Sequence, residues 1–416
     1  MNALNTLREL HRAGRLSEAA RLVRQTDTND GTLDYFRALG TIELAIGNVA
    51  KARAAFEAAV AVEPQSAPAL NDLGVCLARA GSFEPAAEAF GKAARHPGLR
   101  AAALANLGSA LLRLERPLDA ERAFTQSLKD HPNPQCAVGL ARAWARLGKG
   151  NEAEVLLLQV LNSAAADFLA LDALIDLQLM TPEKRLEWAA RVAARCPGHS
   201  GLCALRIRAA FAVDQESGLA MREPYRELVR VADGSVAELA VCQRAVPSVA
   251  GHPSMEVAPA QHATVGGLHS GDLFAEPTVA TSSIFSELRA LIESRVAAQV
   301  QALQRDHAEH PFVRTRPRRA RLHAWAVVLR AEHYQSAHFH PDAWLSGCLY
   351  LQVPVSGPAP GAGCLDLLPR VPNFDLVVPQ VARSVLFPSC LEHATVPHGG
   401  QGERLSVAFD VVPQEK

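Results

Sequence analysis

The sequence lacks a charge excess, a membrane-spanning run and a secretory leader, and each absence excludes a class of function. Its 42 lysines and arginines nearly balance its 43 aspartates and glutamates, so the formal net charge is -1. This balance leaves no electrostatic footprint for nucleic acid or an anionic membrane, and we expect neither as a partner. No apolar run approaches bilayer-spanning length, and the N-terminus is amphipathic and charged. A cytoplasmic protein is the simplest interpretation.

Paired cysteines are also missing. The eight cysteines are scattered along the chain, and none forms a Cys-x-x-Cys pair. In a chain of 416 residues this spacing indicates reduced thiols and argues against a disulfide framework or a zinc ribbon. The length itself predicts two or more domains, because single hydrophobic cores seldom grow this large.

The front half contains a repeat with a period of 34 residues. Its glycines each follow a leucine and are Gly40, Gly74 and Gly108. Twelve residues after each glycine stands an alanine, and four residues further stands an aromatic: Phe56, Phe90 and Phe124. Small residues let two antiparallel helices approach closely, the aromatic fills the space between them, and a closing proline ends the second helix. The pattern resembles the tetratricopeptide repeat.

This resemblance implies an α-solenoid of helix pairs over residues 1–165, including weaker flanking units, the first of them phased by Gly14 and Ala19. Residues 166–231 keep a helical pattern without the signature, and we expect degenerate or capping helices there. Such repeats act as scaffolds or present a concave groove to a peptide or protein. We expect a protein or peptide partner, which the sequence does not identify.

A change of composition separates the two halves. Residues 232–282 are rich in Pro, Gly, Ser, Ala and His and lack helical periodicity, which predicts an extended connector lying on the second domain. A helix with one apolar stripe follows, with Ser283 as its expected N-cap. The basic run Arg314–Arg319 suits either a nucleic-acid contact or a solvated turn before a strand, and we favour the turn.

Residues 283–416 then read as short β-rich segments behind that helix. The strongest are 323–330 and 344–353, and further candidates are 364–368, 384–387 and 405–412, separated by Gly- and Pro-rich breaks. Many short strands with a flanking helix favour a double-stranded β-helix, a small jelly roll whose open end can hold a metal. The expected fold class is therefore a multidomain α plus β protein, with an α-solenoid followed by this jelly roll.

One group of residues in the second half suits a metal site. His338, His340 and Asp342 alternate along the chain, and His393 follows about fifty residues later. Residues two apart share a face of an extended strand, so the first three could point towards one metal. Two imidazoles, a carboxylate and a distant third imidazole suit a facial Fe(II) site with open coordination positions.

The segments that carry these residues also resemble a family. HFHPDAWLSGCLYLQVP, GCLDLLPR, VLFPSCLEHATVP and ERLSVAFDVVP occur in the order and spacing of the Fe(II)- and 2-oxoglutarate-dependent oxygenase domains found behind tetratricopeptide repeats. The resemblance covers roughly 320–413. It implies a dioxygenase that uses Fe(II), 2-oxoglutarate and O₂, and here it would hydroxylate a protein or peptide side chain recruited by the repeats.

The resemblance also implies roles for individual residues. His393 takes the place of the distal iron ligand. Either His340 and Asp342 complete the site with His338 supporting them, or His338 and His340 bind together, as in related domains with a non-acidic residue where Asp342 stands. Beyond the metal and cosubstrate ligands we assign no catalytic residue.

Arg404 and Ser406 share one side of a strand and stand where similar oxygenases hold the distal carboxylate of 2-oxoglutarate. Tyr350 and Ser346 are expected to add hydroxyl groups to the cosubstrate. Trp325 and Trp344 are expected in the wall or core, and we assign no function to Glu392.

Two other functions remain open. The chain could be a tetratricopeptide adaptor whose β domain is catalytically inactive. It could also be a dioxygenase that uses three histidines on the same barrel without a 2-oxo acid, although Arg404 and Ser406 argue against that alternative.

Overall fold

The computed structural model describes residues 31–163, 168–258, 263–275 and 282–414, together with residues 6, 7, 9, 10, 18, 19, 21 and 22. The chain forms two compact units, Met1–Trp188 and Ala189–Lys416. The weak first repeat expected around Gly14 lies mostly outside the described residues.

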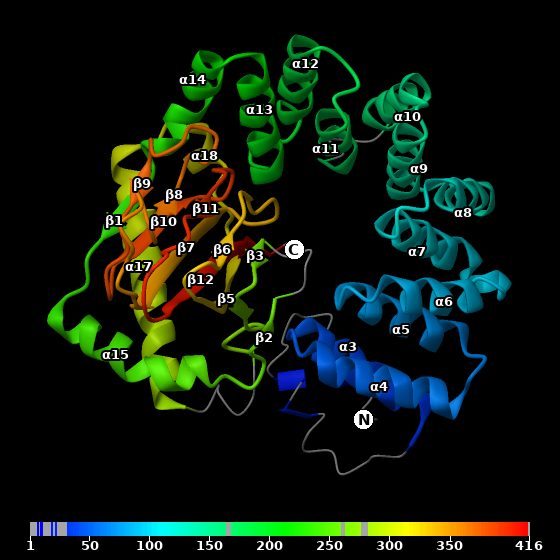
Figure 1. Ribbon diagram of the computed structural model, residues 1–416, viewed down its shortest axis with the longest axis horizontal. Helices are drawn as coiled ribbons and strands as arrows, with labels where there is room; N and C mark the ends of the chain where they lie inside the picture. Colours follow the sequence, from blue (N-terminus) through cyan, green and yellow to red (C-terminus); the bar gives the residue numbers. More distant parts are fainter. Residues whose placement is uncertain are drawn as a thin grey trace. The chain divides into compact units, whose positions relative to one another are not determined.

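The first unit is a succession of antiparallel helix pairs, coloured blue to cyan in Figure 1. Its helices are α3 (Leu33–Ala45), α4 (Val49–Val62), α5 (Ala67–Arg79), α6 (Phe83–Ala93), α7 (Arg100–Arg113), α8 (Pro117–Asp130), α9 (Pro134–Arg146), α10 (Gly150–Ser163) and α11 (Phe168–Asp176), and α12 (Pro182–Ala193) crosses the boundary between the units. Consecutive helices from α3 to α11 pack on each other, as the repeat pattern predicts.

The repeated glycines and aromatics meet inside these pairs. A Cβ added to Gly74 would lie 2.6 Å from Cε1 of Phe90, and one added to Gly108 would lie 2.8 Å from the ring of Phe124. Phe90 and Phe124 are buried. Each glycine therefore admits the aromatic ring of the next helix, which is the packing expected from the sequence.

The second unit begins with two more helices and continues into β structure. Its helices are α13 (Ser200–Val213), α14 (Gln215–Arg226), α15 (Val236–Ala250), α17 (Ser283–Asp306) and α18 (Pro311–Arg314). Its strands are β1 (Arg230–Ala232), β2 (Glu256–Val257), β3 (Thr264–Val265), β4 (Leu268–His269), β5 (Ala320–Leu329), β6 (Tyr334–Gln335), β7 (Leu345–Gln352), β8 (Leu365–Asp366), β9 (Leu376–Val377), β10 (Ser384–Pro388), β11 (Ala394–Thr395) and β12 (Arg404–Pro413).

These strands form one large antiparallel sheet and two small ones. The large sheet has the order β1-β10-β7-β12-β5-β4-β2, and the small ones are β11-β8-β9 and β3-β6. The four longest strands, β5, β7, β10 and β12, all lie where the sequence predicts them. The predicted order of the chain, helical repeats followed by an antiparallel β region, is confirmed, whereas the finer assignment as a double-stranded β-helix stays a prediction.

The two faces of the large sheet have different partners. On β12, Leu405, Val407 and Phe409 pack in one core with residues of α15 and α17, and Figure 1 shows both helices beside the sheet. On the other face, Tyr350 and Phe387 pack with the small β8-β9 sheet. Because side chains alternate along a strand, the residues between those of the first core face the small sheets. That second face carries the candidate site.

Residues 232–282 differ from the expected connector. They include α15, which begins with a capping box formed by Ser235 and Glu238 and buries Cys242, Ala245 and Val249. Strands β2 and β4 from the same stretch join the edge of the large sheet. Within the described residues, this segment is thus part of the core of the second unit. The helix after it does form, and its N-cap is Ser282, one residue before the predicted position.

None of the described helices combines the length and the apolar character that a bilayer crossing requires.

Candidate metal centre

Three of the predicted ligands come together at the place where two distant segments pair. The segments of His338 and His393 form an isolated antiparallel bridge, in which the two main chains exchange hydrogen bonds of 3.0 and 2.8 Å. The ring centroids of His338 and His393 are 4.2 Å apart. One ligand atom from each of these two residues and from His340 lies within 4.8 Å of the other two. The spacing of these atoms suits a single metal ion.

Each imidazole in this cluster already uses its Nδ1 atom. Nδ1 of His338 lies 2.7 Å from the Ser336 carbonyl oxygen, and Nδ1 of His393 lies 3.1 Å from the Leu391 carbonyl oxygen. Nδ1 of His340 lies 2.7 and 2.8 Å from the two carboxylate oxygens of Asp410. These oxygens can only accept, so each Nδ1 carries the proton. The Nε2 lone pair of each ring is left for a metal, the usual arrangement in metal-binding histidines.

Burial keeps His338 and His393 neutral. It lowers the pKa of His338 to about 4, with a further contribution from His340. The pKa of His393 is held well below its usual range by burial first, and then by His338 and His340. At neutral pH no proton competes with a metal for Nε2 of His338 or of His393, and imidazole nitrogens are suitable donors for a divalent transition metal such as Fe(II).

Sequence reasoning missed Asp410, which holds His340 in place. It lies on β12 opposite Ser346 of β7 and accepts a hydrogen bond of 2.6 Å from the Ser346 hydroxyl. That hydroxyl also lies 2.7 Å from the hydroxyl of Ser389. A sequence signal was present, because Asp410 falls on the same alternating positions of β12 as Arg404 and Ser406.

Asp342 does not join the cluster. It lies in an exposed turn after His340, and among the described residues the group that could hold a metal consists of the three histidines. Of the two proximal pairings left open by the sequence, the geometry favours His338 with His340.

Replacing Asp410 with asparagine should lower Fe(II) affinity about 10- to 100-fold, the usual cost of losing the partner that orients a metal-binding histidine. The matched change, Asp342→Asn, should leave affinity unchanged. Anaerobic titration of Fe(II) into the two variants measures the difference. If Asp342→Asn lost the metal and Asp410→Asn retained it, our assignment of the two carboxylates would be reversed.

The expected cosubstrate residues lie on the same face of the sheet as Asp410. Arg404 and Ser406 alternate along β12 with Leu405 and Val407, which pack against α15 and α17. Tyr350 of β7 pairs with Ser406 of β12. Arg404 and Tyr350 are 2% and 0% exposed, and the Arg404 guanidinium carbon lies 5.1 Å from the centroid of the Tyr350 ring. Burial raises the pKa of Tyr350 well above its usual value, so its hydroxyl remains a donor.

Two of these buried donors have no hydrogen-bond partner in the part of the chain that the structure describes. Nη1 of Arg404 donates to the Gly363 carbonyl at 3.3 Å, but Nε of Arg404 and the Tyr350 hydroxyl make no hydrogen bond with the described residues. Unpaired buried donors are costly and uncommon in native proteins. A carboxylate bound between them would satisfy both, so these residues fit the distal end of 2-oxoglutarate.

Ser346 departs from its prediction. Its hydroxyl is engaged by Asp410 and Ser389, so it supports the metal side of the site and is not free to bind the cosubstrate.

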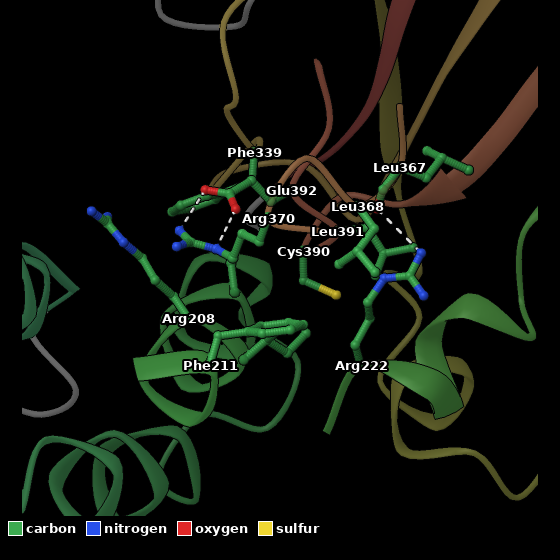
Figure 2. Close-up of a pocket in the computed structure, with 12 residues that line it drawn as sticks. Arg208, Phe211, Arg222, Phe339, Leu367, Leu368, Arg370, Cys390, Leu391 and Glu392 are labelled. Carbon is green, nitrogen blue, oxygen red and sulfur yellow. Dashed lines mark hydrogen bonds and ion pairs between the residues drawn. The ribbon is translucent and has the colours of Figure 1, made fainter. Parts of the chain in front are cut away.

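A second group of residues packs around Phe339 and Glu392, the chain neighbours of the metal-binding histidines. Figure 2 shows Phe339 and Glu392 close together, with Arg370 paired to Glu392 at 2.6 Å. The cavity there, about 20 Å³, has room for little more than one water molecule. Glu392, to which the sequence assigned no function, is the residue next to His393, and its ion pair with Arg370 anchors that position.

The cavity in front of the cluster is larger, about 460 Å³. Its wall includes Trp325, whose ring stacks on His340 with centroids 5.7 Å apart. Trp344 belongs to the core, where it stacks on Phe312. Both tryptophans therefore occupy the expected kinds of position.

Two parts of the chain match models of known families. Residues 37–103 and 105–170 each match the tetratricopeptide repeat. The chain carries tetratricopeptide repeats. Residues 323–367, which include His338 and His340, match the family described as "Putative 2OG-Fe(II) oxygenase". The match and the histidine cluster together point to an oxygenase, although the matched stretch ends before His393 and Arg404.

Solved structures with some likeness to this chain include a tetratricopeptide repeat protein. PilF of Pseudomonas aeruginosa is 18% identical, with a TM-score of 0.41 over 48% of this chain and 93% of that chain. A tetratricopeptide repeat protein of Parabacteroides merdae is 17% identical, with a TM-score of 0.45 over 53% of this chain and 90% of that chain. No curated protein matches the chain significantly.

Proposed function

We propose that this protein is an Fe(II)- and 2-oxoglutarate-dependent dioxygenase that hydroxylates a side chain of a protein or peptide recruited by its repeats. His338, His340 and His393 would hold the iron, and Arg404, Tyr350 and Ser406 would hold the cosubstrate. The observation that supports this best is the set of three imidazoles, each already hydrogen-bonded through Nδ1, on the same face of the sheet as two unpaired buried donors.

Iron supplies the redox chemistry that couples O₂ and the 2-oxo acid to hydroxylation. The residues of the chain prepare the site for it. Asp410 fixes the ring of His340 and keeps the proton on its Nδ1 atom. Arg404 provides the counter-charge for the distal carboxylate, and the Tyr350 hydroxyl adds a second donor. Their burial excludes water from that carboxylate, which strengthens both hydrogen bonds.

Three clustered histidines without a carboxylate ligand also suit a different enzyme, a dioxygenase that uses three histidines and no 2-oxo acid. A catalytically inactive adaptor is the other alternative. Anaerobic addition of Fe(II) and then 2-oxoglutarate separates them, because chelation of the metal by the 2-oxo acid gives a weak visible charge-transfer absorption.

We expect one iron per chain and the absorption band only when both components are present. Iron binding without the band would favour the three-histidine enzyme, and failure to bind iron would favour the adaptor. Admission of O₂ to the complex should then yield succinate, slowly without the true substrate and faster with it.

A further inference from the structure

A second cavity adjoins the one in front of the histidines. Its volume is about 1,040 Å³. Its lining includes Ser200 at the start of α13 and, from the basic run of the sequence, Arg318 and Arg319. The two cavities share four lining residues: Pro341, Asp342, Ala343 and Val412. We call this second cavity the entry groove, because a chain lying in it would reach the metal centre.

The two arginines of the entry groove are available to a ligand. Both are exposed, and neither forms an ion pair with a described residue. Elsewhere in the same unit arginines are paired, for example Arg295 with Glu238 and Arg383 with Asp233. The one carboxylate that the described lining contributes is Asp342, so the groove carries a net positive charge.

The part of the groove at the start of α13 offers a hydrogen-bond donor, the Ser200 hydroxyl, that the described residues leave unpaired. Ser200 is 4% exposed, and its hydroxyl makes no hydrogen bond with the described residues. It is the first residue of α13, whose N-terminal end favours negative charge. The next residue, Gly201, donates its N–H to the Pro341 carbonyl at 3.2 Å, which ties this part of the groove to the residue after His340. An anion held here would lie beside the metal-binding segment.

We propose that the entry groove binds an acidic peptide segment of the substrate, with an Asp or Glu carboxylate held between Ser200 and the pair Arg318 and Arg319. A neighbouring side chain of the same peptide would then enter the 460 Å³ cavity in front of the histidines. This inference rests on the proposed function, since it assigns the substrate class of that site. A peptide fits better than a nucleic acid, because two arginines beside an aspartate cannot neutralise a run of phosphates.

The test uses a fluorescein-labelled peptide of alternating glutamate and glycine, with fluorescence anisotropy of the full-length protein at low salt. The double variant Arg318→Glu/Arg319→Glu should weaken binding at least about tenfold, because two attractive charges become repulsive. Ser200→Ala should weaken it about tenfold through loss of one hydrogen bond to a charged group. Asp342→Asn should strengthen it, since the acidic neighbour is removed.

The matched control is Arg314→Glu/Arg316→Glu, which makes the same charge change in the same run at positions that do not line the groove. It should bind the peptide nearly as the unmodified protein does. Equal losses in both double variants would show non-specific attraction and overturn the proposal. Equally tight binding of a control peptide with glutamine in place of glutamate would also overturn it. So would a labelled thymidine oligonucleotide that binds more tightly than the acidic peptide and loses its binding in the groove variant.

The outcome is independent of the proposed function because peptide binding needs neither iron nor turnover. The groove variant should still give the Fe(II)–2-oxoglutarate absorption, which also shows that it is folded. Peptide binding in a protein that never forms the chelate would leave the groove as a docking site and refute the oxygenase. If the protein forms the Fe(II)–2-oxoglutarate chelate but does not bind the peptide, the proposed role of the entry groove is wrong and the proposed function is unaffected.

Discussion

Replacement of His393 with alanine should abolish Fe(II) binding. His393 contributes one of three clustered imidazoles, and its removal leaves two neighbouring nitrogen donors with no third ligand on the opposite segment. The loss should exceed the roughly 10- to 100-fold expected when only a supporting hydrogen bond is removed. Iron retained after anaerobic loading and gel filtration measures the effect directly.

The variant should remain folded because the bridge between the two segments is made by main-chain atoms, which the substitution leaves in place. His131→Ala is a suitable control, since that histidine is exposed at the end of α8 in the repeats. Iron retention by the control and loss by His393→Ala support the assignment. Full iron retention by a folded His393→Ala protein would show that the metal binds elsewhere.

Replacement of Arg404 with alanine should weaken 2-oxoglutarate binding by about two orders of magnitude or more while iron still binds. Truncating one partner of a buried charge pair generally costs 2–5 kcal/mol, about 30-fold to several thousand-fold in affinity. Arg404 lies on the second face of the sheet and contacts Gly363 and Tyr350, and it is not part of the histidine cluster. Titration of 2-oxoglutarate into the iron-loaded variant, followed by the visible absorption, measures the loss.

Arg330→Ala is the matched control. Arg330 directly follows Leu329, the residue of β5 that pairs with Arg404. Its side chain is exposed and forms an ion pair with Glu403. Its removal should leave 2-oxoglutarate affinity unchanged. If Arg404→Ala kept normal affinity, the distal carboxylate would have to be bound by other residues.

The repeats were predictable because their evidence is local. A glycine and an aromatic sixteen residues later, as Gly74 and Phe90 are, meet within a single helix pair, so the spacing alone identifies the contact. The histidine cluster was predictable for a different reason. Its residues fall in segments whose order resembles that of a known family, and their chemistry suits a metal.

The features that were missed depend on contacts between distant residues or on weak local signals. Asp410 reaches His340 only because β12 lies beside β7 and the segment leading into β7; its alternation with Arg404 and Ser406 indicates its face of β12 but does not identify that contact. Helix α15 was missed because Pro247 interrupts its pattern within a composition typical of loops. Ser235 and Glu238, a recognisable capping box, were the signal that could have found it.

The main-chain bridge between His338 and His393 has a consequence for the metal-free protein. Two of the three ligand-bearing positions are held together by backbone hydrogen bonds, so the donor nitrogens are brought near each other by folding itself. We therefore expect little conformational entropy to be lost when a cation binds, and we expect these two segments to stay paired without it. In this respect the second unit is unlike a zinc finger, which acquires its structure only with its metal.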